Sequence, residues 1–213
     1  MSLSLCFLRH GQTVYSKDHL FCGSGLDPEL TPDGVAMAEE FAATYKNTKW
    51  SAVYASPLRR TVATAMPLCK AISFTMELRD DLKEIGYGAW EGKKVEQVDR
   101  EYHDDHIRWT ADPAWCAPTG GEPAIEIARR GLKVVEEIRD RFVNGNVLVV
   151  SHKATIRIVL CSLLGIDVGR FRYRFACPVG SMSLVEFGPQ GPMLNVLADR
   201  SHLSERLRSL PGA

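Results

Sequence analysis

Three apolar runs of strand length each stop abruptly at polar residues, and this pattern limits the fold more than any other feature of the sequence. The runs cover residues 5–8, 52–55 and 147–150, and a helical pattern follows each one, directly or after a loop. Strands that alternate with helices are typical of an α/β domain with a largely parallel sheet. The run at 147–150 carries β-branched residues on both faces, which predicts a central, buried strand.

Helix and strand signals continue this alternation along the chain. Thr31 and Pro32 suit the N-cap and first position of a helix, and Gly165 suits a helix end. The predicted helices cover residues 32–46, 58–71, 94–111, 123–142 and 153–164, with Ile127, Leu132, Val135 and Ile138 inward on the fourth. The other predicted strands cover 74–76, 180–187 and 192–198, the last two joined by a hairpin turn at 188–192. The tail at 203–213 is expected to be loosely held.

Charge and cysteine content narrow the class of protein. Lys and Arg number 26, as do Asp and Glu, so the net charge is zero and bulk charge favours neither nucleic acid nor membrane as a partner. The first apolar run is too short for a signal peptide or a membrane span, which favours a cytoplasmic location. The six cysteines are widely spaced without a Cys-x-x-Cys pair, and this predicts free thiols rather than disulfides or a zinc site.

Chemically useful side chains follow all three apolar runs. Arg9 and His10 end the first, Arg60 follows the second, His152 follows the third, and Glu84 lies in a loop over 81–92. Parallel strands bring such residues to one sheet edge, where α/β proteins bind ligands. Arginine forks fit phosphate oxygens, a neutral imidazole is a nucleophile, and a carboxyl group can protonate a leaving oxygen. Without a Walker loop or a magnesium carboxylate cluster, metal-free histidine attack on phosphorus fits this set.

Several blocks in the same order resemble the histidine phosphatase (phosphoglycerate mutase-like) superfamily, over about residues 5–203. The blocks are Leu8-Arg9-His10-Gly11-Gln12-Thr13, Ser56-Pro57-Leu58-Arg59-Arg60-Thr61, Glu84 with Gly88-Ala89-Trp90-Glu91-Gly92, and Val149-Val150-Ser151-His152. The resemblance implies a three-layer α/β/α sandwich with a mostly parallel central sheet. It also implies a single domain over 1–213 with a helical, lid-like insertion at about 93–121, and neither a cofactor nor a metal.

The resemblance assigns a role to each matching residue. His10 becomes the phosphohistidine, and Glu84 donates a proton and then activates water. Arg9, Arg60 and His152 hold the phosphoryl oxygens. Ser16, Gly23 and Arg157 are assigned to substrate binding; Lys153 and Arg157 either bind a substrate carboxylate or are solvated helix residues. The chain departs from the family pattern at Ser16, where Asn is common, and at Leu20, where Arg is common.

The function that follows is hydrolysis of a small phosphate ester, and phosphoserine or a similar phosphorylated carboxylate is the first substrate expected. Cofactor-dependent mutases of the family that this chain resembles carry a longer insertion after the Glu motif, with an Arg-Arg pair and consecutive prolines. Neither feature occurs in residues 93–121 of this chain. A phosphoglycerate mutase, a sugar-phosphate phosphatase and a non-catalytic phosphate-binding module remain as alternatives. No nucleic-acid or membrane partner is expected. A homodimer is the oligomer expected if the chain associates, because two-fold dimers are the commonest protein oligomers.

Overall fold

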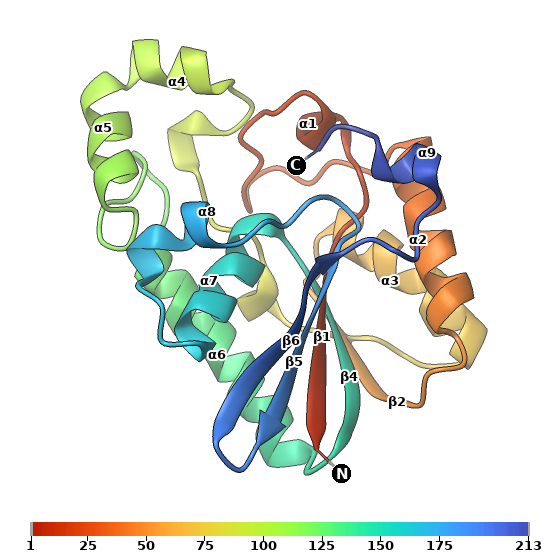
Figure 1. Cartoon of the computed structure of the whole chain (residues 1–213). Helices are drawn as coiled ribbons and strands as arrows, with labels where there is room; N and C mark the ends of the chain where they lie inside the picture. The colour runs from red at the N-terminus through yellow and green to blue at the C-terminus, as the bar shows by residue number, and fades with distance from the viewer. Residues whose placement is uncertain (1, 213) are drawn as a thin grey trace.

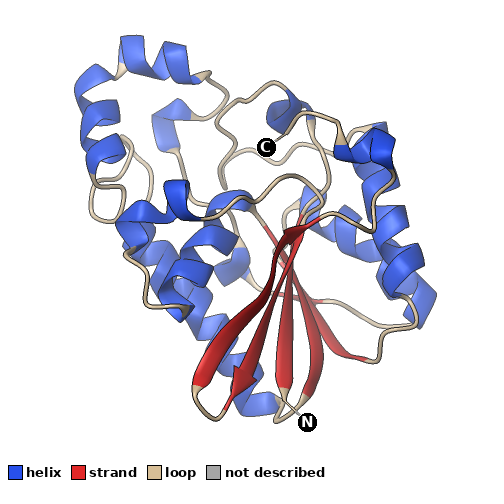
Figure 2. Ribbon diagram, in the orientation of Figure 1, coloured by secondary structure: helices blue, strands red, loops and turns tan. Residues whose placement is uncertain are grey.

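A six-stranded sheet forms the middle of the molecule in the computed structural model, which describes residues 2–212 (Figure 1, Figure 2). Its strands are β1 (Leu3–Arg9), β2 (Trp50–Ala55), β3 (Glu77–Leu78), β4 (Gly145–Ser151), β5 (Met182–Gly188) and β6 (Gly191–Asp199). They lie in the order β3-β2-β4-β1-β5-β6. The pairs β1–β4, β2–β4 and β2–β3 are parallel, whereas β5 and β6 form an antiparallel hairpin at the edge beyond β1. The mostly parallel sheet and the central place of β4 are thereby confirmed.

Helices cover both faces of this sheet and make the molecule three layers thick (Figure 1). One face packs against α6 (Ala124–Arg141) and α7 (Lys153–Leu163), and the other against α2 (Pro32–Tyr45) and α3 (Arg59–Ile72). Along β1, Leu5 and Phe7 face the first pair of helices, and Cys6 and Leu8 face the second. Successive residues of a strand point to opposite faces, so an unbroken apolar run is what a sheet covered on both sides requires.

The remaining helices are short and lie around the sheet edge where the parallel strands end. They are α1 (Val14–Lys17), α4 (Val95–Glu101), α5 (His103–Ala111), α8 (Phe171–Arg174) and α9 (Glu205–Arg208), with single 3₁₀ turns at Asp80–Leu82, Gly88–Trp90 and Val168–Arg170. The helix predicted over 94–111 is broken at Tyr102 into α4 and α5. Trp90, Val98 and Trp109 form a small buried core that joins these two helices to the loop after Glu84. No helix within residues 2–212 combines the length and apolar character needed to cross a bilayer.

Two expectations about single elements are wrong in detail. The strand expected at 74–76 lies instead at β3. Residues 74–76 carry the chain away from α3, which ends at Ile72 and is followed by a C-cap residue, Ser73, with a left-handed φ of 56°. On α6, Leu132 is only half-buried, and Val134 packs in the core in its place. The N-cap prediction is confirmed, since the Thr31 hydroxyl accepts a hydrogen bond from Gly34 N at 3.0 Å.

The C-terminal segment is packed rather than loosely held, which corrects the expectation for the tail. Leu203 and Leu207 are buried against Met37 and Val179, and Figure 1 shows α9 beside α2. The two leucines are four residues apart and place their side chains together on α2. The described chain then continues to residue 212, which lies next to the end of β1 through a hydrogen bond with Arg9.

Candidate active site

The carboxyl ends of β1, β4 and β2 meet at one edge because these strands are parallel and in register. Arg9 pairs with Ser151 across β1 and β4, and Ala55 pairs with Val150 across β2 and β4. A cleft of about 270 Å³ opens at this edge. Of the residues assigned from the sequence, Arg9, His10, Ser16, Glu84 and Arg157 line the cleft, whereas Arg60, His152 and Gly23 do not.

His10 is held in one tautomer by its own backbone neighbour. Its Nδ1 lies 2.8 Å from the carbonyl oxygen of Gly11, which can only accept, so Nδ1 carries the proton and Nε2 keeps its lone pair. Burial lowers the pKa of His10 well below its usual value, and the charges of Arg60 and Arg9 lower it further. The imidazole is therefore neutral at neutral pH and able to act as a nucleophile.

Gly11 is required by the close approach of two backbone segments behind His10. A Cβ atom at this position would lie 2.3 Å from the carbonyl oxygen of Gly34, so no other residue fits without movement. Gly11 N donates to the Thr64 hydroxyl at 3.0 Å, which fixes the turn after β1. The glycine of the Arg-His-Gly motif thus keeps α2 against the strand that leads into His10.

Arg9 is a buried cation with only part of its guanidinium paired. Its Nη1 donates to the carbonyl oxygens of Cys177 at 2.5 Å and Gly212 at 2.8 Å, while its buried Nε has no hydrogen-bond partner among the described residues. Burial lowers the pKa of Arg9. A cation buried in this way is stabilised by an anion in the adjoining cleft.

Arg60 and His152 form a buried pair next to His10 rather than part of the cleft wall. Arg60 Nε donates to His152 Nδ1 at 3.2 Å, which leaves the ring proton on Nε2 to donate to Ser56 Oγ at 2.9 Å. The ring centroids of His10 and His152 are 5.3 Å apart. Burial and the charge of Arg60 lower the pKa of His152 well below its usual value. Arg60 also donates to the carbonyl of Gly23 at 3.0 Å, so Gly23 holds the guanidinium in place.

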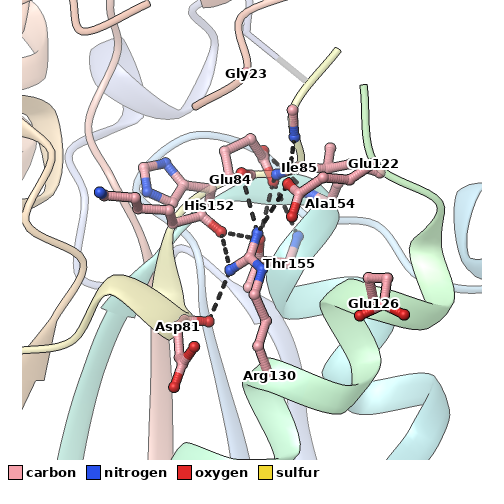
Figure 3. Close-up of polar contacts among 12 residues, drawn as sticks. Gly23, Asp81, Glu84, Ile85, Glu122, Glu126, Arg130, His152, Ala154 and Thr155 are labelled. Carbon is pink, nitrogen blue, oxygen red and sulfur yellow. Dashed lines mark hydrogen bonds and ion pairs between the residues drawn. The ribbon is translucent and has the colours of Figure 1, made fainter. Parts of the chain in front are cut away.

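Glu84 is oriented by donors at the start of α7 (Figure 3). Its Oε2 accepts from Ala154 N at 3.1 Å. Its Oε1 accepts from Thr155 N and the Thr155 hydroxyl at 3.1 Å each, and from Ile85 N at 3.0 Å. The first N–H groups of a helix have no partner inside the helix, so a side chain with two acceptor oxygens is well placed there. The sequence showed Glu84 but gave no sign of the residues that hold it.

Arg130 lies next to the loop that carries Glu84 and binds the backbone of that loop (Figure 3). It donates to the carbonyl oxygens of Asp81 and Lys83 at 2.7 Å each and of Glu84 at 3.1 Å. Its Nη2 also lies 3.5 Å from Glu122 Oε2, which accepts from Gly86 N at 2.8 Å. Sequence reasoning missed this residue, because an arginine on a polar helix resembles a solvated charge.

The other assigned residues surround the open part of the cleft. Ser16 caps α1, accepting from Thr13 N at 2.9 Å, and Leu20 also lines the wall. Arg157 is not a solvated helix residue, because its Nε donates to the carbonyl of Phe175 at 2.6 Å beside the cleft. Residues 2–212 contain no group of three or more His, Cys, Asp or Glu side chains arranged to hold a metal, and all six cysteines are free thiols.

Comparison with known proteins agrees with this geometry. Residues 5–200 match the family model described as histidine phosphatase superfamily (branch 1). A protein named phosphoserine phosphatase 1, from Hydrogenobacter thermophilus, is 31% identical over 203 residues, which is 95% of each chain. A glucosyl-3-phosphoglycerate phosphatase from Mycolicibacterium vanbaalenii is 30% identical over 171 residues, 77% of this chain and 75% of that one. The alpha-ribazole phosphatase structure from Shigella flexneri matches the fold with a TM-score of 0.84 at 23% identity, covering 95% of this chain and 99% of that one.

Proposed function

The chain belongs to branch 1 of the histidine phosphatase superfamily and is a phosphatase with a phosphoglycerate mutase-like fold, and we propose that it hydrolyses phosphate monoesters through a phosphohistidine on His10. The observation that supports this proposal most directly is the hydrogen bond from His10 Nδ1 to the Gly11 carbonyl. It leaves Nε2 unprotonated on a residue that lines a cationic cleft. A neutral imidazole beside fixed positive charge is suited to attack an anionic ester.

The reaction has two displacements at phosphorus. His10 Nε2 forms a bond to phosphorus as the ester P–O bond breaks, and Glu84 gives its proton to the leaving oxygen. Water then attacks the phosphohistidine while Glu84 takes a proton from it, which releases phosphate and restores His10. Arg9, Arg60 and His152 are assigned to the phosphoryl oxygens, with Arg9 at the cleft wall and the Arg60–His152 pair next to the His10 ring. The fixed charges of Arg9 and Arg60 favour the transition state without reorganisation.

A phosphorylated carboxylate, first of all phosphoserine, is the proposed substrate class. The relative named phosphoserine phosphatase 1 spans almost the whole chain and supports this choice. Arg157 at the cleft wall and Lys153 beside it can attract a carboxylate on the leaving group. A cytoplasmic location is part of the proposal, and it is supported by the six free thiols, which are typical of a reducing compartment.

The test is turnover of para-nitrophenyl phosphate in EDTA by the wild type, His10→Ala and a control, His103→Ala, whose side chain is exposed on α5. Wild type and His103→Ala should be active and resistant to EDTA, and His10→Ala should lose at least about a thousandfold in rate. Rapid quenching with a radiolabelled ester should show covalent phosphate on the wild type and on His103→Ala, but not on His10→Ala. Turnover retained by His10→Ala, or lost in EDTA, would contradict the mechanism.

A further inference from the structure

The cleft holds more positive charge than one phosphoryl group needs. Arg9, Lys153, Arg157 and Arg172 all line it, and Glu84 is the one carboxylate among the described lining residues. In the proposed function, Arg9 serves the phosphoryl group at His10. The other three cations stand on α7 and α8, and Arg172 had no role assigned from the sequence. The two guanidinium groups, Arg157 and Arg172, can therefore serve a different part of the substrate.

Arg172 is fixed in place but its charge is not paired. Its Cζ lies 4.2 Å from the ring centroid of Trp109, a buried residue of α5. Its Nη1 is buried without a hydrogen-bond partner, and Arg172 forms no ion pair with any side chain of residues 2–212. Stacking on an aromatic ring holds a guanidinium while leaving its N–H groups free to bind an anion. The unpartnered Nη1 is the observation that points to a ligand.

Arg157 brings a second guanidinium to the same place. It donates to the carbonyl oxygens of Phe175 and Arg172, and these bonds tie α8 and the residue that follows it to α7. The crowding of cations affects a third group, because burial together with the charges of Arg9 and Arg157 lowers the pKa of Lys153 to about 8. The electrostatic repulsion among like charges held this close together is reduced when an anion binds between them.

We propose that Arg172 and Arg157, with Lys153 beside them, form a second anion subsite at the leaving-group end of the cleft. The inference rests on the proposed function, since the first anion is the phosphoryl group at His10. The substrate class is then a phosphate ester whose leaving group carries its own anion, a carboxylate or a second phosphate. Planar guanidinium forks bind either group, and their prior fixation keeps the entropic cost of binding low.

The experiment compares esters that differ in the second anion alone. 3-Phosphoglycerate and glycerol 3-phosphate form the carboxylate pair, and glucose 1,6-bisphosphate and glucose 6-phosphate form the phosphate pair. The wild type should favour the doubly anionic member of at least one pair by roughly tenfold to a hundredfold in kcat/KM. The pair that shows the preference identifies the source of the second anion.

Variants assign that preference to Arg172. Arg172→Leu keeps apolar cover on Trp109 and should remove most of the preference, mainly by raising KM for the doubly anionic ester. Its kcat/KM for the singly anionic member should change less than threefold, and Arg172→Lys should recover part of the preference. Arg174→Leu, an exposed neighbour on α8, is the matched control and should behave as the wild type.

Two results would overturn the subsite. One is a wild type without preference in either pair, which can be measured whether or not the variants fold. The other is an Arg172→Leu enzyme that keeps the preference of the wild type. In both cases, EDTA-resistant turnover that depends on His10 would still support hydrolysis through a phosphohistidine. Failure of that function would appear instead as activity in His10→Ala.

Discussion

At the scale of single residues, the site depends on imidazoles that stay neutral because they are buried. His10 is 6% exposed and His152 is fully buried, and nearby arginines add to the cost of protonating either ring. The neutral state is useful to a nucleophile, but it links folding to pH. In the unfolded chain both rings return to a pKa near 6.5.

Stability should therefore fall as the pH drops below about 6.5. There the unfolded chain takes up protons that the folded chain does not, so each histidine lowers the free energy of unfolding by up to about 1.4 kcal/mol per pH unit. Above pH 7 both states are neutral at these positions, and their contribution is constant. Urea unfolding of the wild type and His10→Gln at pH 7.5, 6.5 and 5.5 measures this. The free energy of unfolding of the variant should depend less steeply on pH, by an amount that corresponds to close to one proton. Equal slopes for the wild type and the variant would contradict the assignment to His10.

Arg130 is a positioning residue for Glu84, because it fixes the backbone carbonyls on which that side chain stands. Arg130→Gln should lower kcat by about tenfold to a hundredfold with little change in KM, because proton transfer by a positioned group contributes on that scale. The loss should be greater for alkyl phosphates than for para-nitrophenyl phosphate, whose leaving group needs less help from an acid. A purely structural role would reduce both substrates equally.

The control for Arg130 is the adjacent Arg129, which is exposed and pairs with Glu126 on the surface of α6. Arg129→Gln should retain both activities, because exposed ion pairs contribute little. Arg130→Lys should recover only part of the kcat, since one ammonium group cannot replace a fork that reaches three carbonyls.

At the scale of elements, the loop after Glu84 depends on a tight contact at Gly88. Its φ is +54°, and a Cβ there would lie 2.2 Å from the carbonyl oxygen of Thr119. Gly88→Ala should lower the free energy of unfolding by about 2–4 kcal/mol, with the left-handed backbone and the clash both contributing. Gly120 also has positive φ, +72°, but open space around it, so Gly120→Ala should cost only about 1 kcal/mol. Equal losses in urea unfolding would show that the clash is relieved.

The C-terminal segment should matter to catalysis, because its backbone holds Arg9. Deletion of residues 209–213 removes the Gly212 carbonyl from Arg9 and the Pro211 carbonyl from Gln12. We expect kcat/KM for para-nitrophenyl phosphate to fall by about tenfold or more, the scale of a hydrogen bond to a charged group. The control is Arg206→Gln, on the same C-terminal segment, which breaks an exposed ion pair with Asp33 of α2. Its kcat/KM should change little. An unaltered kcat/KM after the deletion would show that the C-terminal segment does not contribute to catalysis at the site.

At the scale of the whole molecule, the cationic cleft and the fold stability should be coupled through anion binding. Inorganic phosphate at a hundred times its Kd should stabilise the folded chain by about 2.7 kcal/mol. For a chain of this size that raises Tm by roughly 5–10 °C. Arg9→Gln should lose most of the shift in a thermal scan, with chloride at equal ionic strength as the control. A shift of the same size in the variant would place the bound phosphate elsewhere.

Local sequence patterns were sufficient to predict the central parallel strands of this molecule and the residues at their ends. The runs at 5–8, 52–55 and 147–150 are β1, β2 and β4, and their parallel pairing brings Arg9 and His10 to the edge where α7 begins. The same reasoning was wrong at β3, which is too short to leave a pattern, and at 203–213. There the packing of Leu203 and Leu207 depends on a surface of α2 far away in the sequence.

The sequence alone determined the main parallel strands, the long helices and the sheet edge, because periods of 2 and 3.6 residues record which faces are buried and parallel pairing brings the strand ends together. Only the tertiary structure decided which groups hold the residues proposed for catalysis. Glu84 is held from 46 residues away by Arg130, and Arg9 from 203 residues away by Gly212. Those contacts use backbone carbonyls, which every residue carries and no motif marks. The surplus of cations is likewise a property of the assembled cleft, since α7 and α8 each supply only part of it.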